Sequence, residues 1–258
     1  MNGELALTLD DVSVSFGGNH VLDGLSTRFE VGFTGLMGPN GAGKTTLLNV
    51  ICGFLNPNSG QVTLAGERLS GLSTTRIARR GVARTFQSPR LIEDLTVLQN
   101  AMLGFHQHYT AGHIRELFGS RKARRDEREF QQQALHLLDL FGLSDFAHRE
   151  AGSLPLGSQK IVEVVRALVS RPRALLLDEP AAGLGAKDVD AMLAGLNSAV
   201  DVSEVVVVII EHDIELVTRL CPRASVLHFG RMIAEGTPAS VLADPVVRDA
   251  YLGVEDAA

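Results

Sequence analysis

The stretch that decides the fold reads Gly38-Pro39-Asn40-Gly41-Ala42-Gly43-Lys44-Thr45-Thr46. It satisfies the pattern G-x-x-x-x-G-K-[ST], in which glycines let backbone N–H groups cradle phosphate oxygens. A helix that begins at this loop would point its positive end at the same anion. Lys44 would reach the β- and γ-phosphates of a nucleotide, and Thr45 would hold Mg²⁺. The alternative is a glycine turn that matches by chance, and the apolar run at residues 33–37 before the loop argues against it.

A second polar group follows the aliphatic run at residues 174–177, which ends in Asp178-Glu179-Pro180. Sites collect at the carboxyl ends of parallel strands, so this end is expected beside the phosphate loop. Asp178 would then bind Mg²⁺ through water, and Glu179 would polarise the attacking water. The alternative is a polar strand end that leads into a turn.

The pattern around these motifs alternates between strands and helices, which indicates an α/β fold with a largely parallel sheet buried on both faces. Expected strands are residues 5–9, 12–16, 25–31, 33–37, 61–64, 174–177 and 205–210, and expected helices are residues 44–52 and 187–200.

The pattern changes between residues 96 and 170. Apolar residues recur there at helical spacing, and Gly142 stands where a helix would end. They are Phe130, Ala134, Leu137, Leu138 and Phe141. We expect one domain over residues 1–258, with a core of residues 1–95 and 171–258 and a helical subdomain at 96–170.

Composition sets the class of protein. The 258 residues carry a net charge of −6, which disfavours a nucleic-acid partner, since such proteins present a basic face. The longest aliphatic run, residues 205–210, is too short to cross a bilayer, and the acidic start of the chain does not resemble a signal peptide. We therefore expect a soluble protein that docks on another chain if it serves a membrane. Cys52 and Cys221 lie in apolar surroundings and are expected to be buried, reduced thiols.

The motifs taken together resemble the ATPases of ABC transporters. The order and rough spacing of the phosphate loop, Gln87, a glycine motif near Gly157, Asp178-Glu179 and His212 carry this resemblance over nearly the whole chain. It implies a P-loop NTPase core with an N-terminal antiparallel β portion and an inserted helical subdomain that holds the signature motif. It also implies two cassettes facing head to tail, with each ATP between the phosphate loop of one and the signature of the other.

The resemblance assigns roles to three further residues. Gln87 matches the glutamine that senses Mg²⁺ and the attacking water, and His212 matches the histidine that contacts the γ-phosphate. Phe16 matches the aromatic residue that stacks on adenine. The alternatives are a polar loop residue for Gln87, a cap or surface group for His212 and a core phenylalanine for Phe16.

The signature motif departs from the family pattern Leu-Ser-Gly-Gly-Gln. Pro155 replaces the serine and Leu156 the first glycine, whereas Gly157 is kept and opens a helix to about residue 169. Ser158 would supply a hydroxyl, and the helix end would still face ATP across the dimer. Either the site works with these groups in a homodimer, or the chain pairs with a different ATPase, which we favour. A non-catalytic regulatory half is a further alternative.

Several stretches resemble the subfamily that serves branched-chain amino-acid importers and their urea and amide relatives. They are residues 77–87, 95–100, 178–184 and 244–253. The resemblance implies permease partners, an external solute-binding protein and a peripheral place on the cytoplasmic face of the inner or plasma membrane. A lipid exporter uses similar ATPases. An ATPase of DNA repair or ribosomes lacks support, because no coiled-coil arm or second cassette is present, and a GTPase lacks its Asn-Lys-x-Asp segment.

Overall fold

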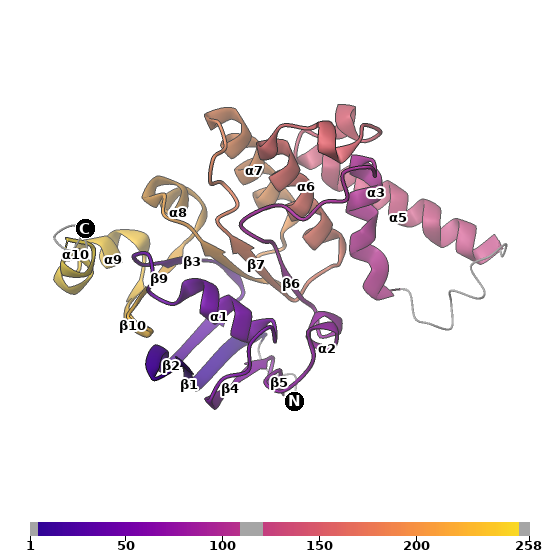
Figure 1. Cartoon of the computed structure of the whole chain (residues 1–258). Helices are drawn as coiled ribbons and strands as arrows, with labels where there is room; N and C mark the ends of the chain where they lie inside the picture. The colour runs from indigo at the N-terminus through magenta and orange to yellow at the C-terminus, as the bar shows by residue number, and fades with distance from the viewer. Residues whose placement is uncertain (1–4, 109–120, 253–258) are drawn as a thin grey trace. The chain divides into compact units, whose positions relative to one another are not determined.

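A computed structural model describes residues 5–108 and 121–252 (Figure 1). The chain divides into two compact units. The first comprises the chain up to Arg84, Arg173–Glu179 and the chain from Asp201, and the second comprises Thr85–Pro172 and Pro180–Val200. The second unit is helical, and it begins at Thr85, before residue 96, and also includes Pro180–Val200.

The first unit is built on a largely parallel sheet with the strand order β10-β9-β3-β8-β7-β6. Three of its four inner strands, β3, β8 and β7, are buried at every residue, which explains their unbroken aliphatic runs. Only β10 runs antiparallel, in a hairpin with β9. The strands are β3 (Gly32–Met37), β6 (Val82–Arg84), β7 (Ala174–Asp178), β8 (Val206–Ile210), β9 (Arg223–His228) and β10 (Arg231–Gly236).

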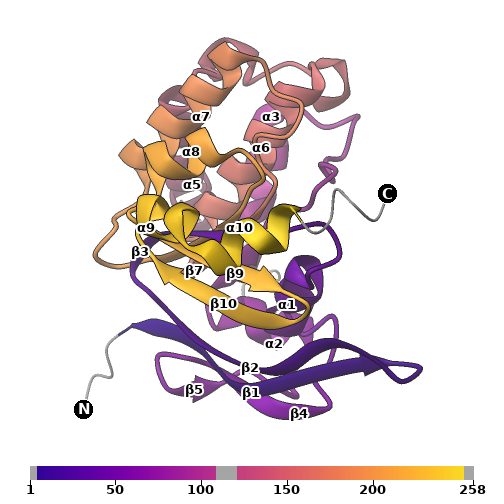
Figure 2. The ribbon, with the colours of Figure 1, turned by 90° about the vertical axis from the view of Figure 1, so that its left-hand side faces the viewer.

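A second, antiparallel sheet has the order β2-β1-β4-β5. Its apolar side chains and those of the parallel sheet enclose helix α1, whose Leu47, Leu48 and Ile51 are buried in the shared core (Figures 1 and 2). The elements are β1 (Ala6–Phe16), β2 (Asn19–Glu30), α1 (Lys44–Ile51), β4 (Ser59–Leu64), β5 (Glu67–Arg68) and α2 (Thr74–Arg79).

The opposite face of the parallel sheet is covered by the C-terminal part of the chain. Helix α8 packs so closely that a Cβ atom added at Gly35 would lie 2.5 Å from Cγ1 of Val217, so this position in β3 must be glycine. Helix α10 lies beside the loop before α1 in Figures 1 and 2, and burial raises the pKa of Tyr251 in this helix. The helices are α8 (Ile214–Leu220), α9 (Pro238–Ala243) and α10 (Pro245–Leu252).

The helical unit packs its helices around a shared apolar core. Phe141 directly follows α5, and its ring packs against α7. A Cβ atom added at Gly195 of α7 would lie 2.5 Å from this ring. Gly142 has φ of 70° and ends α5, as its position predicts. The elements are α3 (Val97–Met102), η1 (Leu103–His108), α5 (Arg121–Leu140), η2 (Ser144–Phe146), η3 (Ala151–Ser153), α6 (Leu156–Val169) and α7 (Ala186–Ala199).

The structure differs from the expected elements at several points, and strand β2 begins at Asn19, six residues before the expected start at residue 25. The two strands expected at residues 5–9 and 12–16 are one strand, β1, which begins at Ala6, because a bulge at Asp11, with φ of 50°, carries the chain across the polar pair 10–11. Strand β6 was not expected, because three residues are too few to show a period.

Both cysteines are buried and free, as predicted, and burial raises the pKa of Cys52 to about 11 and that of Cys221 to about 12. Among the described residues, no helix is long and apolar enough to span a bilayer.

Candidate active site

The phosphate loop runs from the end of β3 to the start of α1, as the sequence predicts. Gly38, Gly41 and Gly43 have φ of 141°, 79° and 108°, values that side chains with a Cβ atom rarely adopt. Helix α1 begins at Lys44 directly after this turn, so the N–H groups of its first turn lack partners within the helix. The turn and the helix end together form a concave, electropositive backbone that suits a phosphate.

Lys44 is buried, with 7% of its surface exposed, and its ammonium group contacts the backbone of its own loop. Its Nζ atom donates to the carbonyl oxygens of Gly38 at 2.6 Å and Pro39 at 2.9 Å. Burial lowers the pKa of Lys44, and the charges of Glu179 and Asp178 oppose this shift. The lysine and both carboxylates therefore share one electrostatic environment.

Asp178 and Glu179 lie at the carboxyl end of β7, next to the end of β8. Asp178 is buried, whereas the side chain of Glu179 is 19% exposed. Nε2 of His212 lies 3.1 Å from Oε1 of Glu179, so the predicted base and the histidine predicted to contact the γ-phosphate are in direct contact. Glu179 has φ of 48°, an unfavourable conformation for a residue with a Cβ atom, which often marks functional positions.

Phe16 and the segment around His212 also belong to the first unit. Phe16 ends β1 with 53% of its surface exposed, so the alternative of a core phenylalanine is wrong. Asp213, next to His212, caps α8 by accepting from the N–H groups of Glu215 and Leu216, which fixes the backbone beside the histidine.

Gln87, Gly157 and Ser158 belong to the helical unit. Gln87 is exposed in the loop after β6. Helix α6 begins at Leu156, and its N-cap Pro155 makes no side-chain capping bond. Gly157 is buried, and a Cβ atom there would lie 3.2 Å from Oδ2 of Asp188.

Models of known protein families match this chain. The family model described as "ABC transporter" matches residues 22–182, which is more than half of the chain. The chain belongs to the ABC transporter family. A second model, "Branched-chain amino acid ATP-binding cassette transporter", matches residues 231–257.

Similar proteins of this family are known over nearly the full chain. The high-affinity branched-chain amino acid transport ATP-binding protein BraF of Pseudomonas aeruginosa is 39% identical over 248 residues, covering 96% of this chain and 97% of that protein. The protein LivG of Escherichia coli, with the same description, is 36% identical over 251 residues, covering 96% and 97%. An ATP-binding cassette of an ABC transporter in its ADP conformation is 30% identical, with a TM-score of 0.80, covering 96% of this chain and 99% of that one.

Membership of the ABC transporter family confirms several predictions from the sequence. The α/β fold with a P-loop NTPase core is confirmed. So are the assignment to the branched-chain importer subfamily and the activity of an ATPase coupled to transport. The roles of the individual site residues stay predictions.

Arg84, at the end of β6, was not among the residues predicted from the sequence. Its Nη2 atom donates to Oδ2 of Asp178 at 2.8 Å, and its Nη1 atom donates to Oδ1 of Asn49 on α1 at 2.7 Å. The side chains of Arg84 and Asp178 are each only 6% exposed. A guanidinium fork therefore ties α1, β6 and β7 together directly behind the predicted magnesium ligand.

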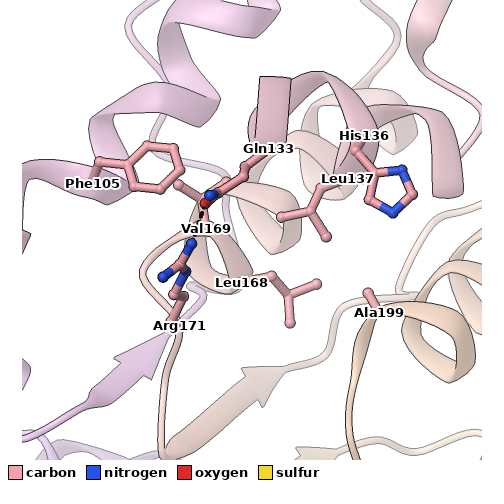
Figure 3. A pocket seen from close by; sticks show the side chains of 8 residues that line it. All are labelled: Phe105, Gln133, His136, Leu137, Leu168, Val169, Arg171 and Ala199. Atoms are coloured by element: carbon pink, nitrogen blue, oxygen red, sulfur yellow. Dashed lines mark hydrogen bonds between the residues drawn. The ribbon is translucent and has the colours of Figure 1, made fainter. Parts of the chain in front are cut away.

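A surface pocket of about 390 Å³ lies in the helical unit (Figure 3). Arg171 donates to Oε1 of Gln133 at 2.6 Å at its edge. None of the predicted site residues lines this pocket. The lining residues are Phe105, Gln133, His136, Leu137, Leu168, Val169, Arg171 and Ala199.

Two glycines of the phosphate loop give a matched test of its shape. A Cβ atom at Gly38 would lie 2.1 Å from the carbonyl oxygen of Leu227, whereas one at Gly41 would meet no atom within 4 Å. We expect Gly38→Ala to weaken ATP binding about 10- to 100-fold, because backbone atoms must shift to admit the methyl group. Gly41→Ala should cost about fivefold through its unfavourable φ alone.

Calorimetric titration of each folded variant with ATP measures this difference. Equal affinities for the two variants would show that contact with Leu227 does not set the shape of the loop.

Proposed function

We propose that the phosphate loop of this chain binds ATP and that Glu179 is the general base for its hydrolysis. The observation that carries the proposal is that Lys44, Asp178 and Glu179 share one electrostatic environment, with His212 in contact with Glu179. In this scheme the loop from Gly38 to Thr46 and Lys44 hold the phosphates, and Phe16 stacks on adenine. Glu179 polarises the attacking water, and His212 contacts the γ-phosphate while orienting the base.

Magnesium fits the donors that the site offers. Mg²⁺ prefers hard oxygen ligands and is usually held by one or two protein groups together with phosphate oxygens. Thr45 in the first turn of α1 and Asp178 at the end of β7 are such donors, and Gln87 is the proposed third contact. The ion, when bound, would neutralise charge on the phosphates.

The transported solute is proposed from the relatives, since this subunit need not contact it. BraF and LivG are described as branched-chain amino acid transport proteins, so we propose import of a branched-chain amino acid or a related small solute such as urea or an amide. The chain would dock on membrane permeases at the cytoplasmic face, and an external binding protein would deliver the solute.

The partner cassette is proposed to be a different ATPase. The support comes from α6, whose N-cap Pro155 has neither a hydroxyl group nor an N–H group to offer to a phosphate. Gly157, Ser158 and the helix end would then be what this chain presents to the partner's ATP. A chain that works only in such a pair should not form a stable homodimer with ATP alone.

Uptake of radiolabelled leucine tests the transport proposal. Deleting this chain from its source cell should lower uptake to background, and the wild-type chain should restore it. Lys44→Ala should not, because removing the buried phosphate-binding ammonium is expected to cost at least about 100-fold in transition-state stabilisation. Restoration by Lys44→Ala would show that ATP hydrolysis here is not needed. Unchanged leucine uptake on deletion, with lost uptake of urea or an amide, would assign the other solute.

A further inference from the structure

Helix α6 contains a buried carboxylate, Glu163, to which the sequence assigns no role. Glu163 lies mid-helix with only 2% of its side chain exposed. Its neighbours Val162, Val164 and Val165 are buried aliphatic residues. A carboxylate in such a position is unfavourable unless its oxygens are hydrogen-bonded, and burial accordingly raises the pKa of Glu163.

The partners of Glu163 are backbone groups of one short loop. Its Oε2 atom accepts from the N–H group of Phe86 at 3.2 Å, and its Oε1 atom accepts from the N–H group of Arg90 at 3.2 Å. Gln87 lies between these two anchors and is itself exposed. The carboxylate therefore holds both ends of the loop that presents Gln87.

Arg166, one turn further along α6, completes the attachment. Its Nη2 atom donates to Oε1 of Glu163 at 3.1 Å, and its Nη1 atom donates to the carbonyl oxygen of Arg90 at 2.6 Å. The guanidinium of Arg90 lies 4.2 Å from the centre of the Phe86 ring and so links the two anchor residues. Backbone and side chains of residues 86–90 are thus tied to the helix that begins at the signature motif.

We infer that Glu163 is a positioning residue that holds the Gln87 loop against helix α6, with Arg166 as its partner. The inference rests on the proposed function, because it assigns Glu163 an effect on hydrolysis through Gln87. Holding both ends of the loop on one helix fixes where the Gln87 amide stands, which matters because small displacements of a group beside the reacting atoms lower the rate steeply.

Glu163→Gln is the sharpest variant, since it keeps size and replaces one acceptor oxygen by an NH₂ group. An NH₂ group donates and does not accept, so the N–H group of Phe86 or that of Arg90 loses its acceptor oxygen. Hydrogen exchange read by mass spectrometry on the purified full chain should become about 10- to 100-fold faster in residues 86–90, because a hydrogen bond to a charged acceptor is lost there. Glu127→Gln, on the exposed side of α5, is the control and should exchange like the wild type.

Steady-state kinetics on the assembled transporter, with the partner cassette present, supply the second readout. We expect kcat of Glu163→Gln to fall about tenfold or more while KM for ATP stays within about twofold, because the phosphate loop is untouched. Arg166→Met should show the same pattern more weakly, and it serves as the second variant if Glu163→Gln folds poorly.

The possible outcomes distinguish a failure of the inference about Glu163 from a failure of the proposed function. Unchanged hydrogen exchange in residues 86–90 would overturn the inference. A fall in kcat with an equal rise in KM, together with faster exchange over the whole helical unit, would also overturn it. A wild-type chain that binds no ATP would refute the proposed function, whereas the exchange comparison would still decide whether Glu163 holds the loop.

Discussion

Glu179→Gln is expected to lower ATP turnover about 10²- to 10⁴-fold, the usual contribution of a positioned general base. The amide has the shape of the carboxylate and can still form a hydrogen bond with His212, which lies 3.1 Å from Oε1 in the wild type. It cannot take a proton from water. The backbone at φ of 48° is unchanged by the substitution, so the loss would report on chemistry rather than folding.

Turnover should be measured on the assembled transporter and ATP affinity on the purified chain, both in saturating Mg²⁺. ATP affinity should change little, because Lys44 and the phosphate loop remain intact. Glu215→Gln, an exposed carboxylate in the first turn of α8, is the control and should keep turnover within about twofold, as surface substitutions usually do. A loss of less than about tenfold for Glu179→Gln would mean that another group activates the water.

The parts of the fold that local pattern determines could be predicted from the sequence. Strands β3, β7 and β8 are buried on both faces, so their aliphatic runs reveal them without any knowledge of the neighbouring strands. The phosphate loop shows itself because its backbone demands glycine at fixed positions. Phe16 could be placed only by resemblance, because one phenylalanine at the end of a strand carries no sign of whether it is exposed.

The features that sequence reasoning missed depend on contacts between distant positions. Arg84 meets Asp178 across 94 positions of the chain, and Glu163 meets Phe86 across 77. In the sequence, Arg84 looks like one of several surface arginines after α2, and Glu163 interrupts an aliphatic helix face. The odd carboxylate in that face was the available signal, since a buried charge requires partners. The left-handed backbone at Glu179 left no signal at all.

Arg84→Met is expected to destabilise the chain by about 3 kcal/mol, because it breaks a buried ion pair and leaves the Asp178 charge without its guanidinium. Breaking such pairs costs about 3–5 kcal/mol, and the lower end applies here because Lys44 also interacts electrostatically with Asp178. The contact with Asn49 on α1 is lost at the same time. Urea unfolding followed by circular dichroism measures the shift. Arg84→Lys should recover only part of the loss, since an ammonium cannot match a fork that joins Asn49 and Asp178.

The double variant Arg84→Met with Asp178→Leu tests the cause. If the cost comes from an uncompensated buried charge, then removing that charge as well should restore most of the stability, because apolar groups can replace a buried ion pair at little cost. If the double variant is less stable than Arg84→Met alone, the uncompensated charge of Asp178 is not the cause of the lost stability. The guanidinium would then stabilise the chain through packing and through its hydrogen bond with Asn49. A loss below about 1 kcal/mol for Arg84→Met would mean that the pair contributes no more than an exposed salt bridge. That result would contradict the expectation from its burial, since each of the two side chains is only 6% exposed.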